Sequence, residues 1–230
     1  MYRAALVSVA LMWGGQVAYA QCTPAAMGGV MINEIYPDAA GSDNDKEWVE
    51  LQNWAFQPVD LSGWTLWAGT SSYNTSFVIP QGTVVTYGDH LHLGGPLVVP
   101  AADVVYPYPG LVMGNASSSC DAIQLRDCFG TVADTVVYGP TNSDGWLDDN
   151  QQVAVCAPAP NSEQALGRVT DGLDTDDLVY DFDWYPVGDE TPGDANWFKI
   201  WADIGAPIQV SRCISAPPLP ERDWVPVIPS

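Results

Sequence analysis

Three short stretches of the sequence decide the fold: Val30-Met-Ile-Asn-Glu-Ile-Tyr36, Glu47-Trp-Val-Glu-Leu-Gln-Asn53 and Asp60-Leu-Ser-Gly-Trp-Thr-Leu66. In the second stretch Val49 and Leu51 point to one face of an extended chain, and the residues between them point to the other. Turn-forming residues separate the stretches, with Gly63 inside the last turn. The pattern therefore predicts short antiparallel strands in a half-buried sheet.

Further strands are predicted along the chain at residues 76–79, 83–87, 90–93, 122–126 and 131–138. The 21 Gly and 19 Pro are spread along the sequence, as in proteins with many short strands joined by turns. A chain of 230 residues is long enough for one such domain with a substantial core. We predict seven to nine strands and a core that includes Ile32, Val49, Leu51, Trp64, Leu66, Ile123, Leu125 and Val136.

Several motifs resemble the lamin tail domain family in its bacterial, secreted form. They are I-N-E-I at 32–35, E-W-V-E-L at 47–51, L-S-G-W-T-L at 61–66, a hairpin at 121–139 and a closing run from Arg168 to Asn196. The resemblance implies an all-β, immunoglobulin-like β-sandwich over residues 30–196. In bacterial proteins such domains are often fused to secreted hydrolases, which implies a targeting role there.

The two ends of the chain have a different composition. Residues 1–20 have the layout of a signal peptide, with Arg3, an apolar stretch and an Ala18-Tyr-Ala20 cleavage site. Residues 21–29 are predicted to be a linker, and residues 197–230 a Pro-rich C-terminal extension. No later segment is apolar for the roughly 20 residues that a membrane span needs. We therefore expect an exported protein, periplasmic or extracellular.

Export to an oxidising compartment predicts disulfides among the five cysteines. Cys120 precedes a predicted strand and Cys128 follows it, so about eight extended residues, spanning about 26 Å, separate them. Disulfide-bonded Cα atoms lie within about 7 Å. One of these two cysteines should therefore pair with Cys156. Cys22 and Cys213 flank the domain and are candidates to join its ends.

Charge and motif content argue against several functions. The chain has 28 acidic and 7 basic residues, a net charge of −21, which disfavours binding to nucleic acid. Solubility is the simplest reason for this charge. No G-x-S-x-G, H-E-x-x-H or phosphate-binding loop occurs, and the two histidines, His90 and His92, lie on one predicted strand. This pair has the spacing of a transition-metal site, but we favour a strand face without metal. We predict no enzymatic activity.

Three non-catalytic functions fit the sequence. The first is an interaction or structural module that displays loops to a protein or cell-envelope partner. The second is glycan binding through exposed indole faces, for which the candidates are Trp54, Trp67, Trp146 and Trp184, although tryptophans in a β-sandwich commonly pack in its core. The third is a targeting module accessory to secreted hydrolases.

An acidic loop adds a candidate calcium site. Asp171, Asp174, Asp176 and Asp177 lie within seven residues, with Gly172 allowing a tight bend. Ca²⁺ prefers six to eight oxygen ligands, and a cation would relieve the repulsion between four carboxylates. The spacing does not follow the EF-hand pattern. The alternative is a turn in which the aspartates bond to nearby backbone N–H groups.

Overall fold

A computed structural model describes residues 22–25 and 29–196 of the chain. The predicted signal peptide, the C-terminal extension and Cys213 lie outside the described residues. Within the described part, helix is limited to one short turn, α1 (Leu178–Asp181). That helix is far shorter than a membrane crossing requires. The described residues contain no helix long and apolar enough to span a membrane.

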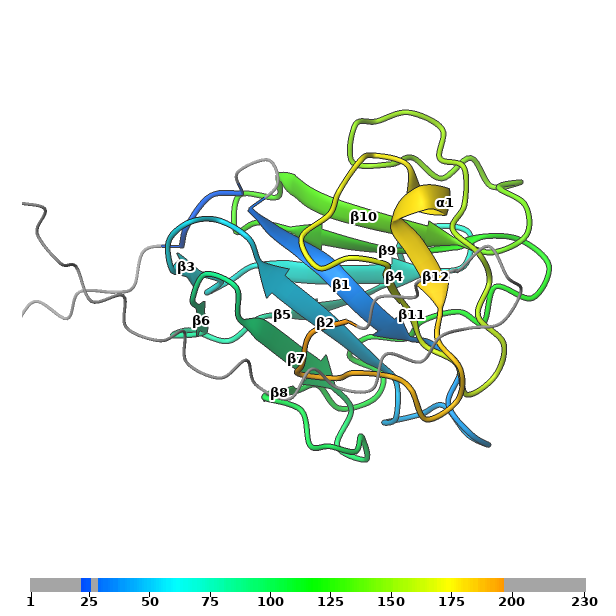
Figure 1. The fold of residues 1–230 in the computed structure, drawn as a ribbon, viewed down its shortest axis with the longest axis horizontal. Coiled ribbons are helices and arrows are strands. Elements are labelled where there is room, and N and C mark those ends of the chain that lie inside the picture. Colours follow the sequence, from blue (N-terminus) through cyan, green and yellow to red (C-terminus); the bar gives the residue numbers. More distant parts are fainter. Residues whose placement is uncertain (1–21, 26–28, 197–230) are drawn as a thin grey trace, which may run out of the picture.

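The larger sheet has six strands in the order β12-β11-β1-β2-β7-β8 (Figure 1). Its pairs are antiparallel apart from the parallel pair at the β7–β8 edge. The central strands β1 and β2 come from the first two of the three stretches that decide the fold. The strands are β1 (Val30–Tyr36), β2 (Trp48–Asn53), β7 (His90–Gly94), β8 (Val104–Val105), β11 (Leu166–Arg168) and β12 (Phe182–Trp184).

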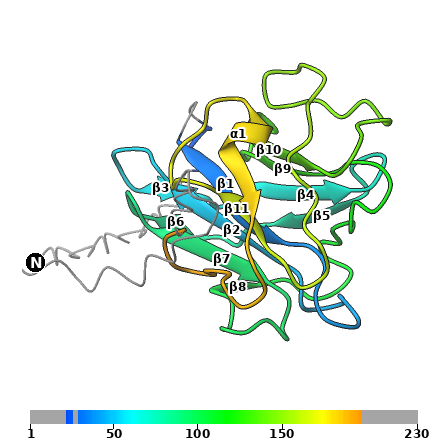
Figure 2. The ribbon, with the colours of Figure 1, turned by 45° about the vertical axis from the view of Figure 1, so that its right-hand side comes forward.

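The second sheet has four antiparallel strands in the order β10-β9-β4-β5. Figures 1 and 2 show the six-stranded sheet lying across it. A separate two-stranded ladder lies at one end. The described residues thus form twelve strands, more than the predicted seven to nine. The remaining strands are β3 (Val59–Asp60), β4 (Thr65–Gly69), β5 (Thr75–Val78), β6 (Val84–Val85), β9 (Asp121–Arg126) and β10 (Val132–Tyr138).

The core lies between the two main sheets and contains all eight predicted residues. Each of them is at most 1% exposed. The side chains come from alternate positions of facing strands, for example Leu51 of β2 and Ile123 of β9, as a two-sheet core requires. The predicted all-β, immunoglobulin-like sandwich is confirmed.

The prediction of a half-buried sheet is wrong for the central strands. Every residue of β2 is buried, and so is every residue of β1 up to Ile35. The outer face is covered because the chain returns over it after β12. A second apolar cluster lies on this face, in which Trp48 packs with Val98, Ala165 and Tyr185. This extra layer of chain allows polar side chains on the outer face to be buried.

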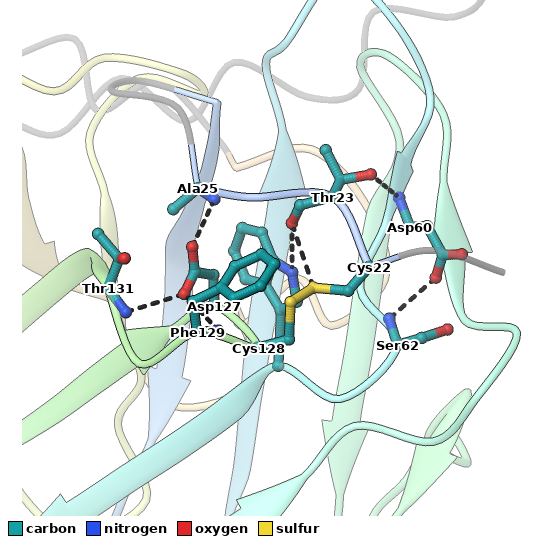
Figure 3. Close-up of a disulfide and its surroundings, with 10 residues drawn as sticks. Cys22, Thr23, Ala25, Asp60, Ser62, Asp127, Cys128, Phe129 and Thr131 are labelled. Atoms are coloured by element: carbon teal, nitrogen blue, oxygen red, sulfur yellow. Dashed lines mark hydrogen bonds between the residues drawn. A yellow bond between two sulfur atoms is a disulfide. The ribbon is translucent and has the colours of Figure 1, made fainter.

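Two disulfides clamp the sandwich. Cys120, just before β9, is bonded to Cys156, which confirms that one of the two central cysteines pairs with Cys156. Cys22 is bonded to Cys128 in the turn between β9 and β10, so the suggested Cys22–Cys213 pairing is wrong (Figure 3).

The segment expected to be a linker is fixed to the domain near this second disulfide. The backbone N–H of Ala25 donates to Asp127 Oδ2 (2.9 Å), and the Thr23 carbonyl accepts from Trp64 Nε1 (2.8 Å). Thr23 Oγ1 also accepts from the backbone N–H of Asp60 (3.1 Å), as Figure 3 shows. The domain therefore begins at Cys22 at the latest.

We expect removal of the Cys22–Cys128 bond, by Cys22→Ser with Cys128→Ser, to lower the free energy of unfolding by about 4–5 kcal/mol. The bond joins residues 106 apart, and a cross-link closing a long loop restricts the unfolded chain most. Loss of Cys120–Cys156, with a separation of 36 residues, should cost less, about 3–4 kcal/mol. Denaturant titrations measure both values. Non-reducing peptide mapping that found Cys120 bonded to Cys128 would contradict this connectivity.

Candidate functional site

The outer face of the larger sheet carries two glutamates that are withdrawn from solvent. Glu34 of β1 and Glu50 of β2 pair directly across the strands, and both are fully buried. The β1–β2 register shifts between Ile32 and Glu34, so a bulge interrupts the alternation of side chains there. Both carboxylates lie under the segment that follows β12.

These glutamates accept hydrogen bonds from the closing segment. Glu34 Oε2 accepts from Thr191 Oγ1 (2.7 Å), and both Glu34 oxygens lie 3.3 Å from the Thr191 backbone N. Glu50 Oε2 accepts from the backbone N–H of Gly193 (2.6 Å), while its Oε1 accepts from Asn33 Nδ2 (2.8 Å). Glu34 of β1 therefore holds Thr191, and Glu50 of β2 holds Gly193, of the closing run.

Glu34, Glu50 and the side chains bonded to them form a buried polar layer on the outer face of the larger sheet. Asp171 extends this polar layer toward β7. Its Oδ1 accepts from Asn33 Nδ2 and from the backbone N–H of Asn196, each at 3.1 Å. Its Oδ2 lies 3.3 Å from His90 Nε2. Asn196 also donates through Nδ2 to the carbonyls of Asn33 (3.2 Å) and Arg168 (2.8 Å). Side chains far apart in the sequence thus form one hydrogen-bonded network.

Gly167 of β11 makes room for this network. It pairs with Glu34 across the β1–β11 ladder. A Cβ at Gly167 would lie 2.7 Å from the ring of Tyr185 and 3.1 Å from Glu34 Cγ, closer than packed atoms normally approach. Any larger residue would push Glu34 or the closing segment away.

Burial changes the protonation of the layer. Desolvation raises the pKa of Glu34 to about 8, against the opposing hydrogen bonds from Thr191. Burial also raises the pKa of Glu50 to about 7, although His90 and Asn33 act in the other direction. For His90, burial lowers the pKa, but Asp171 and Glu50 outweigh it, so the pKa is raised. The two glutamates of the layer are buried acceptors that fix the backbone at Thr191 and Gly193.

Arg168 forms a second buried site between the sheets. Its guanidinium donates to the Ile32 carbonyl (3.0 Å), to Asp134 Oδ2 (2.9 Å) and to the Leu173 carbonyl (2.7 Å). Asp174 and Asp181 lie 3.4 and 3.6 Å away. Burial lowers the pKa of Arg168, but the three aspartates outweigh it, so its pKa is raised. The group therefore remains a buried cation.

Three of the four aspartates predicted to bind calcium have separate roles, and the fourth, Asp176, is exposed. Asp171 belongs to the polar layer, and Asp174 faces Arg168. Asp177 caps α1, accepting from the backbone N–H groups of Val179 and Tyr180. The turn interpretation thus describes Asp177, and Arg168 supplies a cation for Asp174.

The structure gathers a different set of carboxylates. Among the described residues, one group offers three ligand atoms within 4.8 Å of one another: Asp134, Asp149 and Asp174. Burial, followed by repulsion from neighbouring aspartates, raises the pKa of Asp149 to about 6. No described cation lies within 4.0 Å of the Asp149 carboxylate. Sequence reasoning missed Asp149 because it lies in a long loop without a metal-ligand spacing.

The histidines and tryptophans singled out from the sequence have structural contacts. His92 packs edge-on against Trp48 at 5.2 Å, whereas His90 faces Asp171, so the two imidazoles have different partners. Of the candidate glycan-binding indoles, Trp146 is buried, and Trp54 and Trp67 are half-buried. Trp184 is 37% exposed.

Two acidic residues inside apolar stretches of the sequence indicate the polar layer. Glu34 stands within an apolar strand, between Ile32 and Ile35, and Glu50 stands between Val49 and Leu51. An acid in such a run occupies the outer face of the strand. Its burial depended on a cover that residues 185–196 supply and that strand periodicity does not reveal.

We expect protein stability to fall as pH rises from about 4.5 to 8. A carboxyl whose folded pKa is raised binds more protons in the folded state, so its stabilising effect is present below pH 4.5 and is lost as pH passes the folded value. Glu34→Gln should reduce the fall in unfolding free energy by at most about 1.4 kcal/mol per pH unit. Denaturant titrations across this range, with Glu163→Gln as a surface control, test it. An unchanged slope in Glu34→Gln would contradict the assignment.

Calcium binding by the acidic loop stays a prediction, and the geometry sharpens its test. A bound ion should raise the melting temperature by mass action. Asp149→Asn and Asp174→Asn should remove the rise, because both carboxylates belong to the three-aspartate group. Asp176→Asn, outside that group, should retain it. A melt unaffected by millimolar Ca²⁺ and by chelator would contradict the prediction.

Comparison with known proteins supports the fold and its family. A search of curated proteins finds no match. Residues 23–140, just over half of the chain, match the model of the Lamin Tail Domain family. The matched region ends after β10, yet β11 and β12 complete the same six-stranded sheet. The lamin tail domain is a non-enzymatic, immunoglobulin-like fold. The chain belongs to the lamin tail domain family.

Proposed function

We propose that this protein is an exported, non-catalytic interaction module that displays loops on a rigid β-sandwich to a protein or cell-envelope partner. The observation that carries the proposal is the position of the most exposed apolar side chains. Phe56, Val99, Phe129 and Val155, each more than 70% exposed, lie in connections between strands. The central strands are buried, so apolar surface is presented mainly by loops.

An aromatic cluster formed by Trp54, Phe56 and Tyr87 is the strongest candidate contact surface. Phe56 is 87% and Tyr87 43% exposed, with ring centroids 4.9 Å apart. Trp54 supports Tyr87 from 5.5 Å. The Trp54 indole packs directly against Gly172, where a Cβ would collide with it. Aromatic side chains are enriched in protein interfaces, and rings held in place lose little entropy on binding.

Export is supported by the signal-peptide layout of residues 1–20 and by the two disulfides. The net charge of −21 repels other acidic molecules and favours a neutral or basic partner surface. A targeting role beside secreted hydrolases is one form of the same function.

The test is a site-specific cross-link in the native organism's envelope or culture fluid. We expect a photoreactive phenylalanine analogue at Phe56 to give a discrete adduct. Excess mature wild-type protein should compete it away, since it presents the same ring. The Phe56→Ser protein should not compete, whereas Val99→Ser, which removes an equally exposed apolar side chain from another loop, should compete fully.

An adduct that neither the wild-type nor the Val99→Ser protein competes away would contradict the proposed interaction surface. Hydrolysis of a glycan, ester or phosphodiester by the purified protein, lost on mutation of a defined acid pair, would contradict the non-catalytic part. Edman sequencing of the exported protein should begin at Gln21. These three readouts separate the partner, the chemistry and the export.

A further inference from the structure

An open groove of about 330 Å³ lies on the outer face of the four-stranded sheet. Its floor is formed by Gln124 and Arg126 of β9. Its sides are lined by Tyr73 in the β4–β5 connection and by residues 144–147 in the long loop after β10, which is yellow-green in Figure 2. The volume is within the range of small-ligand sites.

Arg126 is an unusual group on so acidic a protein. The described residues include three Lys or Arg side chains, and the other two are engaged: Arg168 is buried among aspartates, and Lys46 Nζ donates to the Ala40 carbonyl. Within the described chain, no carboxylate lies within 4.0 Å of Arg126. A cation without an ion pair is therefore presented in the groove.

The guanidinium of Arg126 is held in one orientation. Its Cζ lies 4.8 Å from the ring centroid of Trp67 and 5.3 Å from that of Tyr73. Its Nε donates to Gln124 Oε1 (2.6 Å), and Gln124 is fixed in turn by Thr135. The two terminal nitrogens have no hydrogen bond to any described residue. Guanidinium groups that stack on aromatic faces and keep this fork free suit bidentate binding of a carboxylate.

The side of the groove at Tyr73 is held in place by the buried Trp146. Trp146 meets Tyr73 edge to face at 4.8 Å. Its indole Nε1 donates to the Cys120 carbonyl (2.8 Å), and its backbone N–H donates to Asn142 Oδ1 (2.8 Å). The Cys120–Cys156 disulfide ties this loop to the sheet. Trp146 is buried behind the half-buried Tyr73, so the ordered Tyr73 ring is the aromatic surface that the C–H face of a sugar can contact without rearrangement.

The rim of the groove is polar. Ser71, Asp144 and Gln151 line it and are exposed. A carboxylate such as Asp144 is an acceptor only, so it suits ligand hydroxyl groups and repels ligand anions. A polyanion with dense charge is disfavoured by Asp144 and by the net charge of −21. The groove offers one site for an anion, surrounded by groups for hydroxyls.

We propose that this groove binds a uronic acid unit of a glycan. The carboxylate pairs with the free fork of Arg126, the ring lies against Tyr73, and the hydroxyls bond to Asp144 and Gln151. The inference rests on the proposed role as a non-catalytic binding module. It uses a surface different from the aromatic cluster, so the two are tested separately.

The test is calorimetric or NMR titration of the mature, disulfide-bonded protein with a glucuronate-terminated disaccharide and its glucose-terminated counterpart. We expect saturable binding of the acidic sugar, at least about tenfold tighter than the neutral one. Arg126→Gln should abolish this preference, and Tyr73→Ala should weaken both interactions. Unchanged melting temperatures and disulfides exclude misfolding.

Tyr73→Phe is the matched control. The Tyr73 hydroxyl is buried and has no partner among the described residues, so its removal should leave binding unchanged while the ring is kept. Equal binding of the two disaccharides, or none at millimolar concentration, would overturn the proposal. Tighter binding of a neutral peptide with a free C-terminus would assign the groove to peptide ends instead. A failed cross-link at Phe56 with intact sugar binding would overturn only the protein-partner role.

Discussion

The buried guanidinium of Arg168 is the interaction on which the architecture depends. It binds the Ile32 carbonyl of one sheet and the Asp134 carboxylate of the other, and it meets the loop before α1 through Leu173. The guanidinium Cζ also lies 4.7 Å from the ring centroid of Phe182. Replacing only one member of a buried charge set leaves the others without compensation, which is costly. The position thus fixes both sheets and the loop before α1 relative to one another.

The acidic composition is organised rather than uniform. Many of the acids are on the surface, but Glu34 and Glu50 are buried to accept backbone hydrogen bonds, and Asp134 and Asp181 surround a cation. Buried carboxylates with such partners specify where each N–H must lie, because an unsatisfied group would be expensive. Charge that at first suggests only solubility therefore also determines the path of the chain.

The sequence predicted the parts of this fold that depend on local pattern. Residues such as Leu51 and Ile123 were assigned to the core because alternation and turn chemistry are local properties. The burial of both faces of β1 and β2 was not predictable in this way, since the cover comes from residues more than a hundred positions later. The same holds for the three-aspartate group, which unites β10 with two loops. Single-sequence spacing carries no information on such distant contacts.

The position of β1 has a consequence for the order of folding. This strand is the first of the domain, yet one of its two neighbours is β11, at residues 166–168, and its Glu34 accepts a hydrogen bond from Thr191. A chain that emerges from its N-terminus cannot complete the larger sheet until nearly all of it is available. Contacts of such long sequence separation slow folding. The hairpin of β9 and β10, whose pairing is local in sequence, can therefore form earlier than the larger sheet.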